Sequence, residues 1–242
     1  MSSSTKQRGF DPEDKRWFSV KAVANLKIAL QEIQWLLDRG YKEGPVVTFV
    51  GNHYQFSLRQ RNALKRASCT KLQAQRRKLA QLPYQAANER SLIIDGFNLI
   101  IALEVALSGG PLILGADGVL RDLAGVSGSY RIIEQTDRAL EILGQAFKRL
   151  AVPKAKFLLD APISNSGQLK HRILNHAHNW LTDVEVELVP NADVVLSKME
   201  RVITGDSVIL DQCQSWINLS REIVERDIQS AWIVSLCDGP CL

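Results

Sequence analysis

Residues 91–98 read Ser-Leu-Ile-Ile-Asp-Gly-Phe-Asn, a short apolar run that stops at an acid. Three consecutive apolar residues predict a buried strand, and the Asp95-Gly96 pair after them predicts a turn. An amphipathic helix follows and ends near Gly109. In an open parallel sheet, the end of such a strand is where ligands bind. This stretch therefore decides the fold class and indicates where a site would lie.

The same pattern recurs towards the C-terminus, where apolar runs alternate with amphipathic segments. Strands are expected at 92–94, 155–159, 184–189, 201–204 and 231–236, and helices at 134–150, 164–180, 191–196 and 207–226. Strands that alternate with helices favour a parallel sheet with helices on both faces. Glu185 and Glu187 alternate with apolar residues, which indicates an edge strand. The glycine-rich residues 111–131 are expected to form a long loop.

The residues before this pattern predict a mostly helical region. One amphipathic helix is expected over Trp17–Leu37, and another from a Ser57 cap to Leu82, where Pro83 ends it. Between them, residues 45–50 read Pro-Val-Val-Thr-Phe-Val and predict a short strand. We therefore expect two domains, a basic and mostly helical one over 1–88 and an α/β one over 89–242.

Charge is divided unevenly along the chain. Residues 1–90 hold 17 Lys and Arg against 7 Asp and Glu, and the rest hold 13 against 19. The net charge of +4 therefore combines a basic part (+10) with an acidic part (−6). A basic surface attracts polyanions, of which nucleic acid is the commonest in the cytoplasm. The alternative is that these charges only solvate helix faces.

The basic charge is concentrated in the predicted helix 57–82, which contains no acid. A helix without compensating acids repels itself unless an anion lies nearby. We expect it to bind nucleic acid through Arg59, Arg61, Lys65, Arg66, Lys71, Arg76, Arg77 and Lys78.

Three predicted strands end in a carboxylate, at Asp95, Asp160 and Asp206. Asp211 lies five residues past Asp206, within the helix expected there, and Asp193 follows another strand. Carboxylates that converge cannot all stay ionised without cations between them, and hard oxygen ligands favour Mg²⁺ or Mn²⁺. Such a site could hold a phosphodiester and activate water.

Each of these residues also has a purely structural interpretation. Asp95 and Asp160 could belong to turns, Asp206 could cap the helix after it, and Asn98 could cap a helix or orient a water molecule. Asp193 and Asp211 could face solvent, and Glu104 could face either the site or the solvent. Ser164, Asn165 and Ser166 offer hydroxyls and backbone N–H groups to a phosphate, or form a plain cap. The long loop could act as a lid that brings Arg121 and Arg131 to a phosphate backbone.

Several other classes are disfavoured. The chain has no GxxxxGK[ST], GxGxxG or HExxH motif, and His171, His176 and His178 are best explained as a solvated helix face. Cys69, Cys213, Cys237 and Cys241 form no CxxC pair, so a reduced protein is expected. No run approaches the roughly 20 apolar residues of a membrane span, and residues 1–8 lack an apolar signal core. We expect a cytoplasmic protein with no membrane partner.

The run Asp-Gly-Phe-Asn after an apolar strand, the acid after a later strand and Thr204-Gly-Asp-Ser resemble the PIN-like nuclease fold, in its NYN-like branch. The wider chain is similar to a family of uncharacterised prokaryotic proteins in which a basic N-terminal domain precedes a PIN-like part. That similarity rests on Gly51-Asn52, Tyr54-Gln55, Arg59–Leu64, Asp160–Gly167 and Asp206–Asp211. The resemblance implies a PIN-like parallel sheet flanked by helices. It also implies that Asp95, Asp160 and Asp206, with Asp211 as a fourth acid, bind a divalent metal and cut RNA. Glu104 and Asp122 compete for the place of the acid that such proteins carry on an early or middle helix.

Three functional hypotheses follow. The first is a metal-dependent ribonuclease, in which Asp95, Asp160 and Asp206 are catalytic and bind Mg²⁺ or Mn²⁺ together with Asp211. The second is a non-catalytic RNA-binding adaptor on a nuclease-like scaffold. The third is a metal-dependent phosphatase that acts on a small phosphorylated substrate. The oligomeric state is left open.

Overall fold

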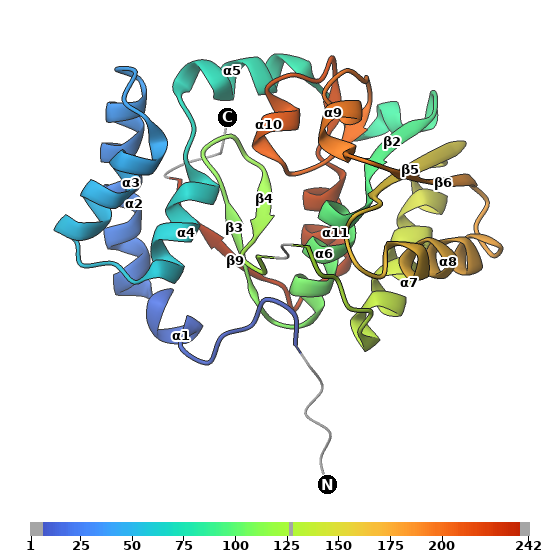
Figure 1. Ribbon diagram of the computed structural model, residues 1–242, viewed down its shortest axis with the longest axis horizontal. Helices are drawn as coiled ribbons and strands as arrows, with labels where there is room; N and C mark the ends of the chain where they lie inside the picture. The colour runs from blue at the N-terminus through green and yellow to red at the C-terminus, as the bar shows by residue number, and fades with distance from the viewer. Residues whose placement is uncertain (1–6, 126–127, 238–242) are drawn as a thin grey trace, which may run out of the picture.

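The computed structural model describes residues 7–125 and 128–237. Within them the chain forms an α/β structure with a mostly helical N-terminal end (Figure 1). The helices are α1 (Asp14–Trp17), α2 (Val20–Leu37), α3 (Glu43–His53), α4 (Leu58–Ala67), α5 (Lys71–Ala80), η1 (Tyr84–Asn88), α6 (Gly96–Leu107), α7 (Glu134–Arg149), α8 (Ser166–Ala177), α9 (Ala192–Leu196), α10 (Ser207–Leu210) and α11 (Leu219–Asp227). The strands are β1 (Gln81–Leu82), β2 (Leu92–Asp95), β3 (Pro111–Leu114), β4 (Leu120–Asp122), β5 (Lys154–Asp160), β6 (Asp183–Val189), β7 (Val202–Ile203), β8 (Trp216–Ile217) and β9 (Trp232–Ser235).

The main sheet of the described residues has six strands in the order β1-β8-β7-β2-β5-β6. Every neighbouring pair is parallel, as the alternation of strands and helices predicts. Strand β2 lies inside the sheet between β7 and β5, with Asp95 beside Leu158. Strand β6 lies at the edge, which confirms the position expected from its alternating glutamates.

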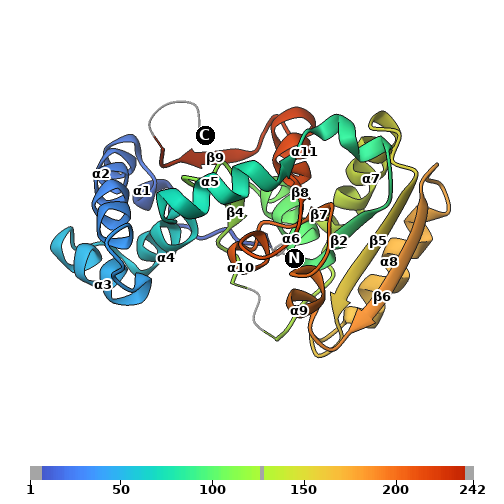
Figure 2. The same ribbon diagram turned by 90° about the horizontal axis from the view of Figure 1, so that it is seen from above.

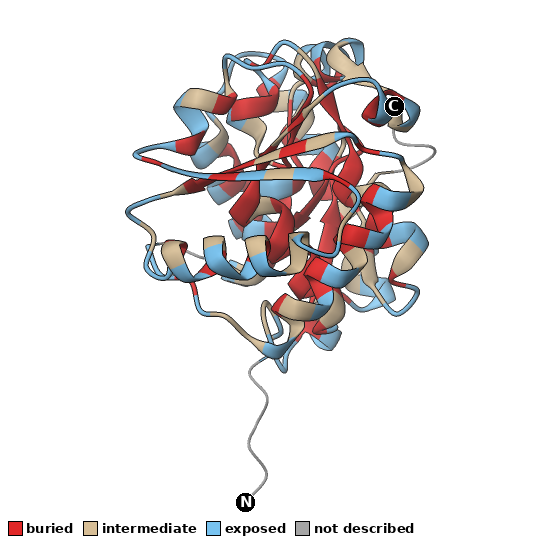
Figure 3. Cartoon of the chain, turned by 90° about the vertical axis from the view of Figure 1, so that its right-hand side faces the viewer, coloured by how far each residue is buried: buried red, intermediate tan, exposed pale blue. Residues whose placement is uncertain are grey.

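Alternate residues of the inner strands pack on opposite faces of this sheet. Ile94 and Phe157 belong to a core with α6, α7, α8 and α11, whereas Leu158 belongs to a core with α9 and α10. Figure 3 shows the buried strands in red, with helices whose outer surfaces are exposed. Helices therefore cover both faces of the sheet.

A second sheet has the order β4-β3-β9. Residues 111–131 were expected to be a loop, and that expectation is wrong for β3 and β4, which pair antiparallel as a hairpin. Pro111–Leu114 is fully apolar, and the strand is stabilised by parallel pairing with the distant β9. The pairing partner lies more than 100 residues away, so local sequence gave no sign of it.

The N-terminal helices pack on this second sheet rather than standing alone. Residues of α2, α3 and α4 share one apolar core with Ile113, Leu123 and Val234. In Figure 2, α5 runs from these helices towards α11 and the main sheet. Strand β1, which precedes the expected boundary at residue 88, pairs with β8.

Three predicted elements of the N-terminal region are corrected by the structure. The expected strand at 45–50 is part of α3, because Val46, Val47 and Val50 lie at helical spacing and pack into the core of the N-terminal helices. The single helix expected over Ser57–Leu82 is two helices, each with a capping box: Ser57 with Gln60, and Thr70 with Gln73. The helix expected from Trp17 begins at Val20, after the short α1.

The expected helix over 207–226 is also wrong. It consists of α10, β8 and α11, because Trp216 and Ile217 are fully buried as a strand between β1 and β7. Among the helices of the described part of the chain, none is long and apolar enough to cross a membrane.

Candidate acidic site at the carboxyl end of the main sheet

A small pocket of about 150 Å³ lies where the strands β2 and β7 end. Four carboxylates line it together with one cation, Arg66, and the amide of Asn98. The carboxylates are Asp95, Asp122, Asp193 and Asp206. Two of the three acids predicted at strand ends, Asp95 and Asp206, therefore meet in one pocket.

Asp95 is the buried acid of this pocket. It caps α6, since its Oδ1 accepts from the backbone N–H of Asn98 at 3.3 Å, and its Oδ2 accepts from the Thr204 hydroxyl at 2.8 Å. Burial raises the pKa of Asp95 to about 7, and the charges of Asp193 and Asp206 push it in the same direction. The two hydrogen bonds oppose this shift without cancelling it.

The glycine after Asp95 is required by packing. A Cβ atom at Gly96 would lie 2.5 Å from Leu159 Cδ2 and 3.2 Å from the backbone oxygen of Leu158. The start of α6 therefore approaches β5 too closely for any side chain at this position. The Asp-Gly pair sets the entry of α6 and with it the place of Asp95.

Asp206 caps α10, because its Oδ1 accepts from the N–H groups of Val208 at 2.7 Å and Ile209 at 3.4 Å. The capping interpretation of this residue is thus correct, and the same side chain also lines the pocket. Partial burial and the charges of Asp206 and Asp160 raise the pKa of Asp193. Asp193 and Asp206 are therefore close enough to repel each other.

Asn98 links the two strand ends. Its Oδ1 accepts from the backbone N–H of Gly205 at 2.6 Å. A Cβ atom at Gly205 would lie 3.1 Å from this oxygen and from the backbone oxygen of Leu120, which explains the glycine in Thr204-Gly-Asp. Thr204 was not expected to belong to the site. The sign in the sequence was its place in the run Thr204-Gly-Asp-Ser, two residues before Asp206.

Asp160 lies near the pocket without lining it. Its Oδ1 accepts from the N–H of Ala192 at 2.7 Å and so holds the start of α9, which carries Asp193. Its charge contributes to the raised pKa of Asp193. Asp160 therefore lies close to Asp193 but does not itself line the pocket.

Asp211 does not lie in the pocket. The chain leaves the helical path after α10, and Asp211 pairs with Arg77, with 2.7 Å between Oδ1 and Nε. It also accepts from Gln73 Nε2 at 2.8 Å. Asp211 is therefore paired with Arg77 and does not line the pocket, and its role as a fourth metal ligand stays a prediction.

Asp122, at the end of β4, fills the remaining side of the pocket. Its competitor Glu104 is fully buried in α6 and forms an ion pair with Arg8 and hydrogen bonds with Tyr130 and Thr136. Of the two, Asp122 is the one in contact with the pocket. It was hard to identify from the sequence because β4 was expected to be loop.

A larger cavity of about 450 Å³ adjoins the acidic pocket. The two share Arg66, Gly125 and Asp206 in their linings. Its other lining residues are Glu43, Asn62, Lys65, Leu123, Ser207 and Val208. The end of the basic helix α4 thus lies directly beside the acids of the main sheet.

The basic residues predicted to bind nucleic acid fall into two groups. Lys65, Arg66, Lys71, Arg76 and Lys78 are exposed. The others have internal partners: Arg59 pairs with Asp14 at 2.8 Å, Arg61 donates to Asn52 Oδ1 at 2.8 Å, and Arg77 is buried between Asp117 and Asp211. Burial opposes the charge on Arg77, but its two carboxylate partners raise its pKa above the ordinary value.

The expected lid residues are also placed differently. Arg121 is buried on β4, where it forms an ion pair with Asp117 and donates to the backbone oxygen of Gly205 at 2.7 Å. It is therefore not available to a phosphate, because its donors are used inside the fold. Arg131 is exposed and does not line the acidic pocket.

The predicted phosphate-binding turn before α8 makes local bonds. Ser166 Oγ donates to the backbone oxygen of Ala161 at 3.3 Å, and Asn165 Nδ2 donates to that of Tyr130 at 2.6 Å. Ser164 pairs with Ser129 in an isolated bridge. None of the three residues of this turn lines the acidic pocket.

The pocket acids fit a divalent cation by their chemistry. Among residues 7–125 and 128–237, no Lys or Arg lies within ion-pair distance of Asp95, Asp122, Asp193 or Asp206. No three His, Cys, Asp or Glu of these residues are close enough to hold one ion together. Mg²⁺ commonly uses only one or two carboxylates and keeps several water molecules, so two of these acids suffice as direct ligands.

Fold and site together define an α/β protein with an acidic pocket at the strand ends and a basic helical region beside it. Residues 84–222 match the family described as "Domain of unknown function (DUF5616)", and residues 25–79 match "Protein of unknown function (DUF434)". The sequence is 33% identical over 205 residues to uncharacterized protein MJ0935 of Methanocaldococcus jannaschii. The aligned region covers 83% of this chain and 97% of that protein. The chain therefore belongs to the DUF5616 family. No solved structure matches it. The two family matches fall on either side of residues 80–83, and the domain boundary at residue 88 stays a prediction.

Proposed function

We propose that this protein is a metal-dependent nuclease that cleaves RNA. The observation that carries the proposal is the shared wall of two cavities, where Asp206 and Arg66 line both the acidic pocket and the larger cavity, to which α4 adds a second cation, Lys65. A phosphodiester needs both features, because a cation-binding carboxylate cluster does the chemistry and basic side chains neutralise the phosphates. The preference for RNA rests on the resemblance of residues 92–98 and 204–207 to PIN-like nucleases.

Each residue has a distinct role in this proposal. Two of the acids Asp95, Asp193 and Asp206 would hold Mg²⁺ or Mn²⁺ directly, with water molecules as the other ligands, and the ion when bound would supply an activated water and stabilise the leaving oxygen. Asn98 has its carbonyl oxygen fixed by Gly205, so its amide N–H groups are the donors left for a phosphate oxygen. Arg66 lies between the two cavities and would hold the scissile phosphate, while Lys65 would neutralise the next one.

Asp95 connects cation binding to pH. Its pKa of about 7 leaves it partly protonated at neutral pH in the free protein. A carboxylate must lose its proton to bind a cation. Cation affinity should therefore rise as the pH passes through 7.

The direct test is cleavage of a 5′-labelled single-stranded RNA with Mn²⁺ in the buffer. Asp206→Asn keeps the helix cap, since Asn and Asp are equally good caps, and removes the charge. We expect it to lower the cleavage rate by more than about 100-fold. Such a loss exceeds the usual effect of removing a residue that only hydrogen-bonds to a metal ligand, and so indicates a direct ligand. Asp183→Asn is the matched control, because Asp183 is exposed at the start of β6. Equal rates for the wild type and Asp206→Asn, or cleavage in EDTA, would contradict the proposal.

A second candidate function is RNA binding without catalysis. It is favoured by one observation, that no three potential ligands of the described chain lie close enough for a single ion. The melting temperature in Mn²⁺ separates the two functions. A ligand at 100 times its Kd stabilises the native state by about 2.7 kcal/mol, so a nuclease should show a clear upward shift that Asp193→Asn abolishes. An adaptor should show no shift and should bind RNA equally well in EDTA.

A further inference from the structure

Helix α8 is an acid-free helix in the acidic part of the chain. Its sequence, Ser-Gly-Gln-Leu-Lys-His-Arg-Ile-Leu-Asn-His-Ala, contains Lys170 and Arg172 and no Asp or Glu. The residues after position 90 carry a net charge of −6, so a helix without acids stands out in this part. The two cationic side chains of α8 are therefore not balanced by any acid of the same helix.

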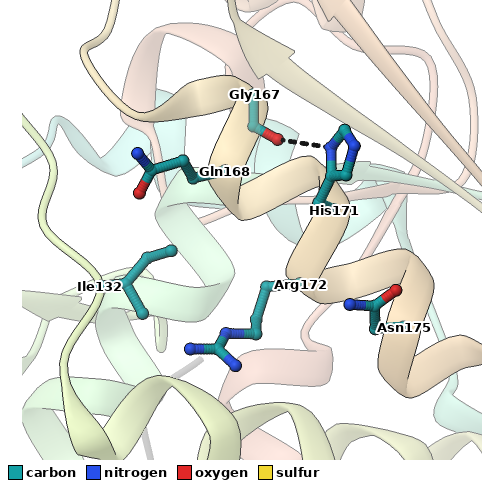
Figure 4. A pocket seen from close by; sticks show the side chains of 6 residues that line it. All are labelled: Ile132, Gly167, Gln168, His171, Arg172 and Asn175. Atoms are coloured by element: carbon teal, nitrogen blue, oxygen red, sulfur yellow. Dashed lines mark hydrogen bonds between the residues drawn. The ribbon is translucent and has the colours of Figure 1, made fainter.

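A groove of about 630 Å³ runs along this helix (Figure 4). Gln168, His171, Arg172 and Asn175 line it from successive turns of α8, and Ile132 lines it from the segment before α7. In Figure 4, Arg172 and Ile132 face each other across the groove. The three histidines that the sequence explained as a solvated face thus include one, His171, in a concave surface.

The lining surface is mainly apolar with one cation, Arg172, so it suits the bases of a nucleic acid more than a run of phosphates. Amide and guanidinium groups pair with base edges, and the planar guanidinium and imidazole groups can stack on bases. RNA is recognised by sequence mainly where its bases are unpaired, because base edges in an A-form helix are hard to reach. The groove therefore fits an unpaired stretch of RNA better than a duplex.

Arg172 is not committed to the fold. Its Nε lies 3.3 Å from Asp137 Oδ1, and His176 Nε2 lies 3.0 Å from the same oxygen. The side chains of Arg172 and Asp137 are 44% and 39% exposed. An ion pair this exposed contributes little to stability, so the guanidinium can exchange Asp137 for a phosphate.

The groove and the acidic pocket each have a lining residue from the same part of the sequence. Gly125 lines the pocket and Ile132 lines the groove. Seven residues span at most about 25 Å, so one RNA strand of several nucleotides could reach from the groove to the pocket. The start of α8 is joined to this segment, since Ser164 N donates to the backbone oxygen of Gly128 at 3.2 Å and Asn165 donates to Tyr130.

We propose that the α8 groove binds an unpaired stretch of RNA several nucleotides from the bond that the acidic pocket would cleave. The claim that the bound RNA is also cleaved rests on the proposed function, whereas the binding of RNA in the groove does not. The acids would then be flanked by two cationic surfaces, α4 on one side and α8 on the other.

The test measures binding without cleavage. Fluorescence anisotropy gives the Kd of a labelled 14-nucleotide poly-U RNA for the Asp95→Asn protein in EDTA. Adding Arg172→Glu should weaken binding by about tenfold or more. It should also reduce the slope of log K against log salt by about 0.7, the value for one phosphate contact of a single strand. Gln168→Ala removes one amide without a change of charge and should weaken binding in the same direction.

Arg226→Glu is the matched control, because Arg226 is an exposed arginine that lies near a helical carboxylate, 3.9 Å from Glu222. It changes the charge by the same amount on α11 and should leave the Kd unchanged. Unchanged binding of Arg172→Glu and Gln168→Ala, an equal loss in Arg226→Glu, or no binding of the 14-nucleotide RNA at all would overturn the inference. Groove-dependent binding by a protein that cleaves no RNA would overturn the proposed function alone.

Discussion

Replacing Asp95 by asparagine is expected to stabilise the free protein above pH 7 while abolishing cation binding. The folded protein raises the pKa of Asp95 from its ordinary 3.8 to about 7, so the native state prefers the protonated form. The stability associated with this group is fully present below about pH 4 and is lost as the pH rises through 7. At pH 8 the ionised carboxylate lowers the free energy of unfolding by up to about 4 kcal/mol. Asparagine carries no charge and still caps α6.

Urea unfolding in EDTA checks this prediction at two pH values. The two proteins should differ little at pH 4, and Asp95→Asn should be more stable at pH 8. Asp183→Asn, which removes an exposed carboxylate, should show no such change between the two pH values. A variant that is less stable than the wild type at pH 8 would mean that the charge of Asp95 is satisfied inside the fold, and that the acid is structural.

The expected gain in stability of Asp95→Asn bears on the function of Asp95. A buried acid that forms no ion pair is unfavourable in the free protein, and among the described residues Asp95 has no ion-pair partner. Sites that bind ligands commonly keep such destabilising groups because the ligand compensates for them. Greater stability together with a lost Mn²⁺ shift would therefore distinguish a cation ligand from a helix cap, which asparagine replaces without effect.

The parts of the fold that could be predicted are those in which local pattern and tertiary contact agree. Strand β2 and the edge strand β6 each follow from a few neighbouring residues, whereas the turn expected at Asp95-Gly96 is the direct passage of β2 into α6. Residues 45–50 could not be predicted, because burial against other helices outweighs the β-propensity of valine. The capping box of Thr70 and Gln73 was readable in the sequence and would have divided the long basic helix.

The candidate site, like the fold, could be predicted from the sequence only in part. Acids at strand ends converge because parallel strands end at one edge, which brings Asp95 and Asp206 together. Asp122 could not be assigned, since its strand forms only by pairing with residues of β3. Asp211 pairs instead with Arg77, which lies 134 positions away in the chain. Pairings between distant charges of this kind leave no local pattern.

Replacing Arg121 by methionine is expected to destabilise the protein by about 3–5 kcal/mol, the effect of removing one partner from a buried ion pair. Asp117 is buried between two guanidinium groups, with Arg121 Nη2 at 2.6 Å and Arg77 Nη1 at 2.5 Å from its Oδ2. Burial opposes the charge of Asp117, but Arg121 and Arg77 hold its pKa at about 2. Without Arg121, this carboxylate keeps one cation where it had two.

The same side chain also connects the two halves of the site. Arg121 Nε donates to the backbone oxygen of Gly205 at 2.7 Å, and Nη1 donates to that of Arg66 at 3.2 Å. Gly205 precedes Asp206 and Arg66 lines the larger cavity, so Arg121 fixes the end of α4 against the end of β7. Replacing Arg121 should therefore lower the stability of the protein and also the rate of RNA cleavage by the molecules that remain folded.

Urea unfolding at pH 7 measures the effect of Arg121→Met. Arg90→Met is the control, because Arg90 and Glu200 form a surface pair at 3.8 Å that should contribute less than about 1 kcal/mol. Arg121→Lys should fall between the two, since lysine keeps the charge but cannot bond Asp117 and both backbone oxygens at once. If Arg121→Met were as stable as Arg90→Met, the buried network of Asp117, Arg77 and Arg121 would not hold α4 to the sheet, and the closeness of α4 to the acidic pocket would need another cause.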